Sequence, residues 1–435
     1  MPVSRRQFMG TTGAAIIAGT VGTTRVFGAN ERVSMAVIGF GGRGGEHIDQ
    51  WCEHSADAEL TALCDVDKRI LDRGAASMKN KFNRTVKTFT DMRELFDDAS
   101  IDGVSIATPN HWHTLSAIWA MEAGKDVYVE KPCSHNVWEG RQLVNAAKKY
   151  GRICQHGTQI RSSKGIIEAM QKLKDGVIGE VYMARGLCYK ARPSIGKKPE
   201  GPAPDYLDWD LWQGPAQARS YSPNIVPYNW HWFWQYGNSD LGNQGVHQMD
   251  IARWGLGVDL PAKVSSMGGK FLYDDDKETP NQIVSSFYYP EAGPMGRMIV
   301  FEVRPFRPPQ TNDEAGAAVG NLFYGSDGWM VIDSYSRYKT FLGPKGEPGP
   351  SRDEGGDHFG NFLEAVKTRD ESKLAAPIIE GHYSSALCHL GLVSARLGRS
   401  FDFDPANERA VNDDEVNALL TRDYREPFVV KPIEA

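Results

Sequence analysis

The sequence predicts two domains: an α/β domain built on a doubly wound parallel sheet, then an α+β domain with an open, mainly antiparallel sheet. Two patterns support this fold class. Over residues 32–156, short apolar strand patterns alternate with helical patterns, which is typical of repeated β-α-β units. Over residues 157–400, several strand patterns follow one another without intervening helices, which predicts antiparallel pairing.

Length and composition agree with two globular domains. The chain has 435 residues, more than one ordinary hydrophobic core accommodates. Hydrophobic residues make up 41% and charged residues 24%, as in folded rather than disordered proteins. The formal net charge is -6 and no lysine or arginine block stands out, so no nucleic-acid partner is expected. The six cysteines form no C-x-x-C pair, so we expect buried single thiols and no metal site.

Residues 1–29 have the pattern of an export signal. Arg5 and Arg6 precede Phe8, and a weakly apolar run rich in small residues follows at 10–22. This arrangement resembles a twin-arginine signal, and the apolar run is too short to span a bilayer. We therefore expect a periplasmic or otherwise exported protein without a membrane anchor. A disordered basic tail is the alternative interpretation.

A glycine-rich turn lies between the first predicted strand, residues 33–38, and a predicted helix at 47–53. In a G-x-G-x-x-G turn, the first glycine permits the tight turn and the second lets a pyrophosphate approach the backbone. The third lets helix and strand pack closely, and the helix N-terminus favours the negative phosphates. The pattern predicts a Rossmann domain at 32–156 that binds NAD(P) through Gly39, Phe40, Gly41, Gly42, Arg43 and Gly44.

An acidic residue, Asp65, follows the second predicted strand at 59–64. A carboxylate at this position accepts hydrogen bonds from a ribose 2′-hydroxyl and repels a 2′-phosphate, which favours NAD. Lys68 and Arg69 lie close behind and are able to receive a phosphate, so NADP is not excluded.

Two later strands deliver polar residues to the same carboxyl edge, where open α/β sheets bind their ligands. One strand, at 103–107, is followed by Thr108, Pro109, Asn110 and His113. Thr108 and Asn110 are helix-capping residue types, but Asn110 and His113 are equally suited to contact the ribose of the nicotinamide. The remaining elements expected in this domain are helices at 91–97, 112–123 and 137–148 and a strand at 152–156.

The other strand, at 127–131, ends in Glu130 and Lys131, and Pro132 prevents further ladder bonding. A lysine at a strand end is ordinarily a solvated terminator. Beside a positively charged nicotinamide and partly desolvated, however, Lys131 would have a lowered pKa and could share a proton with a substrate oxygen. We therefore expect Glu130 at the cofactor and Lys131 at both cofactor and substrate.

The second domain is predicted at 157–400. Gln159 and Arg161, which we expect to contact the substrate, precede a helix at 164–174. A long loop at 190–228, rich in proline and glycine, is expected to be functional. Trp230 and His231 are candidates either for a sugar-binding face or for an aromatic core cluster. Strands are expected at 181–187, 262–273, 282–289, 297–303, 321–324 and 329–333, and helices at 245–254, 357–367 and 380–397. The charged tail, 401–435, is expected to lie on the surface.

Together these motifs resemble the Gfo/Idh/MocA family of oxidoreductases, which includes glucose–fructose oxidoreductase and inositol dehydrogenase. The resemblance rests on the glycine fingerprint, Asp65, Thr108-Pro109-Asn110-x-x-His113, Glu130-Lys131-Pro132, Gly179-Glu180-Val181 and the segment Gly245 to Asp250. It implies that Lys131 and His247 flank the reacting carbinol. The family commonly has an aspartate four residues before this histidine, where this chain has Asn243. Asn243 can orient the imidazole or a sugar hydroxyl but cannot take a proton.

The resemblance implies an NAD(P)-dependent oxidoreductase that transfers hydride from a hydroxyl of a sugar, glycoside or cyclitol. It also implies a homodimer or homotetramer that associates through the second sheet. Some relatives instead hold NAD tightly and cleave glycosides by oxidation, elimination and reduction. Export favours this alternative, because free NAD is scarce outside the cytoplasm. A non-catalytic sugar- or nucleotide-binding relative is the third possibility.

Overall fold

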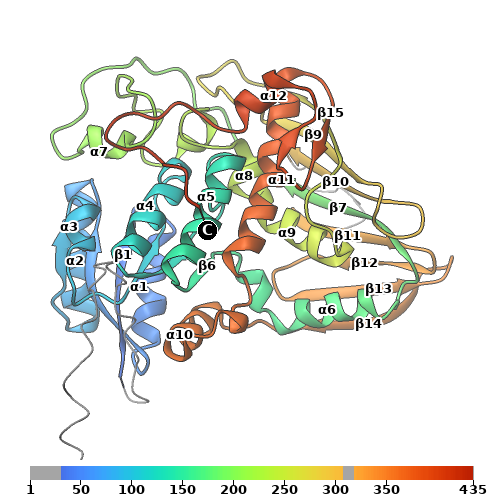
Figure 1. Ribbon diagram of the computed structural model, residues 1–435, viewed down its shortest axis with the longest axis horizontal. Helices are drawn as coiled ribbons and strands as arrows, with labels where there is room; N and C mark the ends of the chain where they lie inside the picture. Colours follow the sequence, from blue (N-terminus) through green and yellow to red (C-terminus); the bar gives the residue numbers. More distant parts are fainter. Residues whose placement is uncertain (1–30, 307–317, 435) are drawn as a thin grey trace, which may run out of the picture.

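The structure is a computed structural model that describes residues 31–306 and 318–434. The predicted export signal lies outside the described residues. The chain forms two domains side by side, each built on one sheet (Figure 1). Within the described residues, no helix is both long and apolar enough to cross a membrane.

The first domain contains a six-stranded sheet in the order β3-β2-β1-β4-β5-β6, with all neighbours parallel. This strand order and the intervening helices confirm the predicted Rossmann fold. Its strands are β1 (Val33–Ile38), β2 (Ala58–Cys64), β3 (Lys87–Phe89), β4 (Gly103–Ile106), β5 (Asp126–Val129) and β6 (Cys154–His156). Its helices are α1 (Gly44–Glu53), α2 (Lys68–Phe82), α3 (Met92–Phe96), α4 (Asn110–Glu122) and α5 (Val137–Tyr150).

Three features of this domain differ from the sequence-based expectation. Strand β3 was not expected and has only three residues. Helix α2 was not expected, because only Leu71, Gly74 and Met78 of its fifteen residues are buried and charged side chains dilute the apolar pattern. Strand β5 ends at Val129 rather than at Lys131, so Lys131 lies in the loop beyond the strand. It still lies at the carboxyl edge of the sheet, as predicted.

The second domain contains a ten-stranded sheet in the order β14-β13-β12-β11-β7-β10-β9-β8-β15-β16. Only the β7–β10 pair is parallel, which confirms the mainly antiparallel sheet. Its first strands are β7 (Val181–Tyr189), β8 (Lys263–Gly269), β9 (Gln282–Tyr289), β10 (Arg297–Arg304) and β11 (Val319–Gly325). The others are β12 (Gly328–Ile332), β13 (Arg337–Leu342), β14 (Glu347–Asp353), β15 (Phe401–Asp404) and β16 (Arg409–Ala410).

Helices cover one face of this sheet. The helical segments are η1 (Gln159–Ser162), α6 (Lys164–Lys174), α7 (Trp209–Gln213), η2 (Asn229–Trp232), α8 (Ser239–Asn243), α9 (Gly245–Leu256), α10 (His358–Thr368), η3 (Glu371–Lys373), α11 (Ile378–Leu397) and α12 (Asp414–Leu419). Helix α9 packs on β7, α11 on β8 and α6 on β13 (Figure 1). The expected strand at 262–273 ends at Gly269, and β13 and β14 were not expected from the sequence pattern.

The two domains are joined by late segments of the chain. Helix α11 packs against α5 of the first domain and α9 of the second. In α10, Phe359 stacks on Tyr128 of β5 at a ring distance of 4.8 Å. The tail does not simply lie on the surface, because Phe428 and Val430 are buried in the core of the first domain. The cofactor edge and the second domain are therefore held in one fixed arrangement.

Candidate active site

A cavity of about 590 Å³ lies at the carboxyl edge of the parallel sheet and is lined by both domains. Pockets of this size ordinarily accept small molecules. Of the residues predicted from sequence, it brings together Gly39, Gly41, Gly42, Arg43, Asp65, Thr108, Pro109, Asn110, His113, Glu130, Lys131, Gln159, Trp230, Asn243 and His247. Phe40, Gly44, Arg161 and His231 do not line it.

The glycine turn has the geometry that close approach of a pyrophosphate requires. Gly39 has a φ of +76°, in the left-handed region that favours glycine. A Cβ on Gly44 would lie 2.1 Å from the carbonyl oxygen of Gly39, so only glycine lets α1 pack this closely on the turn. No side chain caps the first turn of α1; the N–H groups of Gly45 and Glu46 donate to the carbonyl oxygens of Gly42 and Arg43, at 2.9 and 3.0 Å. Gly44 thus shapes the cavity without lining it.

Asp65 lies at the end of β2, where backbone groups fix its carboxylate. The N–H of Phe40 donates to Oδ2 at 3.0 Å, and the N–H of Asp67 donates to Oδ1 at 2.9 Å. Burial raises the pKa of Asp65 to about 6 despite these two hydrogen bonds. Phe40 contributes this N–H, while its ring is buried against Gly74.

Arg69, one of the two basic residues that follow Asp65, is engaged by neighbouring side chains. Arg69 donates from Nε and Nη2 to the carboxylate of Asp67, at 3.2 and 2.8 Å. Its guanidinium also lies 3.3 Å from the ring centroid of Tyr206. Since the guanidinium is engaged on both sides, the site favours the unphosphorylated ribose of NAD.

Residues 206–212, which we term the strap, cross the cavity near Asp65. On one side, Leu207 forms a β-bridge with Asp67, and the N–H of Lys68 donates to the carbonyl oxygen of Tyr206 at 2.9 Å. On the other side, the indole N–H of Trp112 donates to the carbonyl oxygens of Leu211 and Trp212, at 3.0 and 3.1 Å. The strap is therefore held from the ends of both β2 and β4. The side chains of Leu207, Leu211 and Trp212 line the cavity beneath it.

Asn110 and His113 shape the edge of the cavity through contacts within the protein. Asn110 does not cap α4; its amide donates to Oδ1 of Asn238 at 3.0 Å. The ring of His113 lies between the carbonyl oxygens of Pro132 and Thr108, at 2.6 and 2.7 Å. The hydroxyl of Thr108, by contrast, has no hydrogen-bond partner among the described residues. Thr108 is consequently the residue of this loop best placed to bind a ligand.

Glu130 is the buried anion of the site. His47 contacts its Oε1 from Nε2 at 3.1 Å, and Nε of Arg43 donates to the same oxygen at 3.1 Å. Burial alone would raise the pKa of Glu130, but the His47 hydrogen bond and the charge of Arg43 hold it well below its ordinary value. Glu130 thus remains ionised and anchors the glycine turn to the end of β5.

Lys131 and His247 lie in the same cavity. The ammonium group of Lys131 donates to the backbone carbonyl oxygen of Asn243. Burial lowers the pKa of Lys131, Glu130 opposes this shift, and Lys190 adds to it. Burial also lowers the pKa of His247 well below its ordinary value, and the charge of Lys131 adds to this shift. At neutral pH, His247 is therefore an uncharged imidazole.

Asn243 does not orient His247. Its amide points to Oδ1 of Asp240 and to the hydroxyl of Tyr228, each at 3.4 Å. Nδ1 of His247 has no hydrogen-bond partner among the described residues, and its ring packs beside Tyr335 at 5.2 Å. An acid–histidine relay is thus lacking in this part of the structure, and the carbonyl group of Asn243 positions Lys131 instead.

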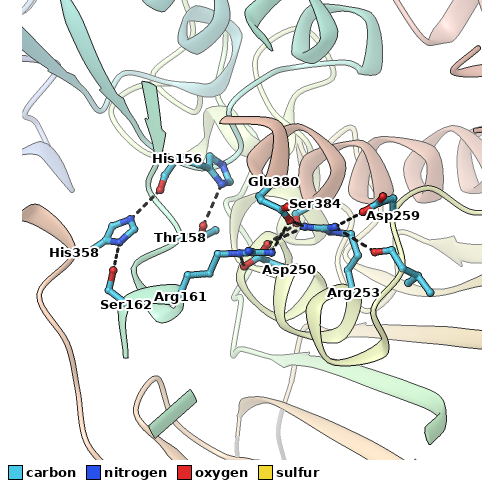
Figure 2. A network of polar contacts seen from close by, with 11 residues as sticks. His156, Thr158, Arg161, Ser162, Asp250, Arg253, Asp259, His358, Glu380 and Ser384 are labelled. Atoms are coloured by element: carbon cyan, nitrogen blue, oxygen red, sulfur yellow. Dashed lines mark hydrogen bonds and ion pairs between the residues drawn. The ribbon is translucent and has the colours of Figure 1, made fainter. Parts of the chain in front are cut away.

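Arg161 lies outside the cavity in a buried ion network (Figure 2). It pairs with Asp250 at 2.7 Å and with Glu380 at 3.0 Å, while Arg253 pairs with Glu380 and with Asp259. This network joins the segment after β6 to α9 and α11, and α9 also carries His247. Arg161 is thus a structural residue here rather than a substrate contact, because both of its ion-pair partners are internal.

His231 is likewise turned away, with Nδ1 at 2.9 Å from the carbonyl oxygen of Tyr228. Trp230 and Gln159 do line the cavity, and Oε1 of Gln159 is buried without a partner among the described residues. Gln159 is therefore available to a substrate hydroxyl.

The cavity residues that were missed from the sequence include Lys190, Arg192, Gln244 and Tyr335. Lys190 directly follows β7, a position that the end of the predicted strand could have suggested. Tyr335 lies between β12 and β13 and accepts a hydrogen bond from Gln244 at 2.8 Å. Nothing in the local sequence indicates this role, because the packing of the second sheet alone brings Tyr335 to the cavity.

Comparisons with known proteins agree with this architecture. Residues 33–158 match the oxidoreductase family with an NAD-binding Rossmann fold. Residues 181–272 and 351–430 match the C-terminal alpha/beta domain of that oxidoreductase family. The chain belongs to the Gfo/Idh/MocA family. The first domain of this Gfo/Idh/MocA protein is thus an NAD-binding domain, as its fingerprint predicted.

The curated relatives match about a third of this chain, whereas the solved structures match most of it. A glycosyl hydrolase family 109 protein of Shewanella sp. (strain W3-18-1) is 34% identical over 153 residues, covering 34% of this chain and 33% of the relative. The chain thus matches about a third of the length of such relatives. The structure of levoglucosan dehydrogenase with NADH aligns with a TM-score of 0.65 at 17% identity, covering 86% of this chain and 99% of the other. The WlbA dehydrogenase of Bordetella pertussis, in complex with NADH and UDP-GlcNAcA, aligns with a TM-score of 0.63 at 18% identity, covering 86% and 99%. At this identity the two structures support the Gfo/Idh/MocA fold alone.

The described residues hold no cluster of three or more histidine, cysteine, aspartate or glutamate side chains that could bind a metal ion. All six cysteines are buried, as expected, and carry free thiols. The polar groups that line the cavity of this Gfo/Idh/MocA protein include lysine, histidine, amide and carboxylate side chains.

Proposed function

We propose that this protein cleaves a glycoside with a retained NAD and without net oxidation or reduction. The observation that carries the proposal is the strap, which is hydrogen-bonded from two sides across the end of the cavity that contains Asp65. A cofactor enclosed in this way leaves slowly, and a cofactor that is regenerated in each cycle has no need to leave. The similarity to glycosyl hydrolase family 109 proteins further supports this reading over a net dehydrogenase.

The residues present fit NAD. The turn at Gly39 and Gly44 leaves room for a pyrophosphate, Asp65 suits the ribose hydroxyls, and the unpartnered hydroxyl of Thr108 offers a further contact. When bound, NAD supplies a hydride acceptor and later a hydride donor at the carbinol carbon. Lys131 and Glu130 would then lie at the nicotinamide end of the cofactor.

The protein's own residues supply proton transfer and charge stabilisation. His247, which has a ring nitrogen without a partner among the described residues, can accept the hydroxyl proton as the carbinol becomes a ketone. The ammonium group of Lys131 stabilises negative charge that develops on that oxygen. The ketone acidifies the neighbouring C–H bond, whose proton passes to solvent. Its electron pair forms a C–C double bond, and the glycosidic substituent leaves with the electron pair of the broken C–O bond and takes up a proton. Water then adds to the resulting double bond, and reduction of the ketone completes the cycle.

Two measurements test this function. Denaturing the purified protein should release about one equivalent of nicotinamide cofactor, and an empty supernatant with no affinity for added NAD would refute the cofactor assignment. Incubation of the holoprotein with 4-nitrophenyl glycosides in deuterated water should yield cleaved sugar labelled at the carbon next to the oxidised one. Oxidised sugar formed only with an added electron acceptor would instead indicate an NAD-dependent sugar or cyclitol dehydrogenase. Binding without any turnover would indicate a non-catalytic relative.

We further propose export by the twin-arginine route and assembly of a homodimer or homotetramer through the open face of the second sheet. Strand register places Met267 beside Val284, and Tyr288 beside Met298, on the face that the helices leave uncovered. Met267 is 84% exposed, which is unusual for a large apolar side chain within a sheet. Light scattering after size exclusion should give a multiple of the chain mass, and Met267→Asp should lower it. Fractionation of cells should place the mature protein in the periplasm.

A further inference from the structure

Two lysine ammonium groups enter the substrate end of the cavity, Lys131 and Lys190. Lys131 donates to the carbonyl oxygen of Asn243, and Lys190 donates to Oε1 of the next residue, Gln244. Both acceptors are uncharged. Neither lysine forms a salt bridge with a carboxylate in the part of the chain that the structure describes.

The remaining charges near this end are matched within the protein. Arg192 binds Asp240 through two hydrogen bonds of 2.6 and 2.7 Å, and Asp240 is buried. Arg43 pairs with both Glu130 and Glu46, so Glu130 also compensates part of the charge of its neighbour Lys131. The ammonium group of Lys190, by contrast, pairs with no carboxylate among the described residues, and a bound nicotinamide ring would add further positive charge near it. A neutral sugar would leave this charge uncompensated in a partly desolvated site.

Lys190 is held ready to bind a ligand. It directly follows β7, where Cys188 and Tyr189 are buried. Gln244, its acceptor, is fixed in turn by donating to Tyr335 at 2.8 Å and to Gln248 at 3.2 Å. An ammonium group has three N–H donors, so a single amide acceptor leaves two for a ligand. Lys131, in contrast, lowers the pKa of His247 and is assigned to the reacting carbinol together with it.

We propose that the substrate is an acidic sugar and that Lys190 is the residue that binds its anionic group. The group is a carboxylate, as in a uronic acid, or a sulfate ester; both present oxyanions to which a lysine binds as a point charge. Lys190 acts on specificity, while Lys131 and His247 act on the reacting carbinol. This inference rests on the proposed function only in taking the substrate to be a sugar.

The test compares matched substrates on the holoprotein. 4-Nitrophenyl glucoside, glucuronide and glucoside 6-sulfate are assayed at low ionic strength, and the ratio of kcat/KM for each acidic substrate to that for the neutral one is measured. We expect a ratio above ten for one of the two acidic substrates. If it is the glucuronide, the natural anionic group is a carboxylate; if it is the 6-sulfate, the group is a sulfate ester. Lys190→Met should lower this ratio about ten- to a hundredfold, as for loss of a charge-assisted hydrogen bond. Lys190→Arg should retain most of it, since the positive charge remains.

Two controls keep the result specific. Lys373→Met, which removes a surface lysine paired with Glu364, should leave the ratio unchanged. Direct binding of glucuronate, glucose 6-sulfate and glucose to the holoprotein, followed by tryptophan fluorescence, gives a readout that does not depend on turnover. Equal binding and turnover of acidic and neutral sugars, or the same ratio in Lys190→Met, would overturn the inference. Such a result would leave the proposed cleavage reaction intact, whereas failure to release NAD on denaturation would refute that reaction independently.

Discussion

The ammonium group of Lys131 donates to the main-chain carbonyl of Asn243. The side chain of Asn243 is directed to Asp240 and Tyr228 and away from His247. Among the described residues, the histidine therefore has no carboxylate partner, and the lysine is held by the backbone. Lys131 is accordingly the group whose loss should affect the chemistry most.

Replacing Lys131 by methionine should reduce hydride transfer at least a hundredfold, because the positive charge beside the substrate oxygen is lost. Stopped-flow absorbance of the reduced nicotinamide measures this step. Bound cofactor, quantified after denaturation, should remain near the wild-type level. Turnover at the wild-type rate would remove Lys131 from the mechanism.

Cofactor retention should depend on the protonation of Asp65, whose pKa is raised to about 6. Ribose hydroxyls donate best to the ionised carboxylate, so NAD binding should strengthen as pH rises to about 6 and level off above it. Below this pH the proton competes with the ribose for the carboxylate, so the affinity for NAD should fall by at most about tenfold for each pH unit. The fraction of NAD that survives gel filtration between pH 5 and 8 measures the effect. Asp65→Asn, which cannot ionise, should give weaker retention that does not vary over this range.

The strap should control how fast NAD leaves. Tyr206→Ala removes the ring beneath the guanidinium of Arg69 and should raise the NAD dissociation rate about two- to tenfold, the size of a partly exposed cation–π contact. Exchange of bound NAD for a fluorescent analogue reports this rate. If the rate is unchanged while the fold is intact, the Tyr206–Arg69 contact does not contribute to retention.

A methyl group at Gly44 should disrupt the glycine turn. Because its Cβ would lie 2.1 Å from the carbonyl oxygen of Gly39, Gly44→Ala should destabilise the fold by about 1–3 kcal/mol and weaken NAD binding. Urea unfolding measures the first effect. Gly45→Ala, whose Cβ would lie 4.0 Å from its nearest neighbour, is the matched control. It should be neutral or stabilising, since alanine favours the helix.

Arg161 should matter for stability rather than for substrate binding. Arg161→Met leaves the carboxylate of Asp250 buried without its nearest cation and should cost about 3–5 kcal/mol of unfolding free energy. Arg352→Met removes an arginine from exposed ion pairs and should have a much smaller effect. A large rise in KM with unchanged stability in Arg161→Met would contradict the placement of Arg161 outside the cavity.

The sequence by itself determined the Rossmann domain, its fingerprint, and the positions of Asp65 and Lys131 at one sheet edge. These features depend on local periodicity and on residues that immediately follow strands, so short-range patterns contain them. Helix α2 was not predicted, because charged residues obscure its narrow apolar face. The burial of Phe428 was not predicted either, because a short apolar run in a charged tail has no periodicity.

Only the tertiary structure decided which polar residues meet in the site. Arg161 and Lys190 are both single basic residues in the sequence, yet Arg161 is neutralised by Asp250 and Glu380 while Lys190 faces the cavity. The partner of a charged side chain is set by elements far away along the chain, here α9, α11 and the junction between α8 and α9. Whether a charge is neutralised internally or left for a ligand therefore depends on packing between domains, which no local pattern of residues encodes.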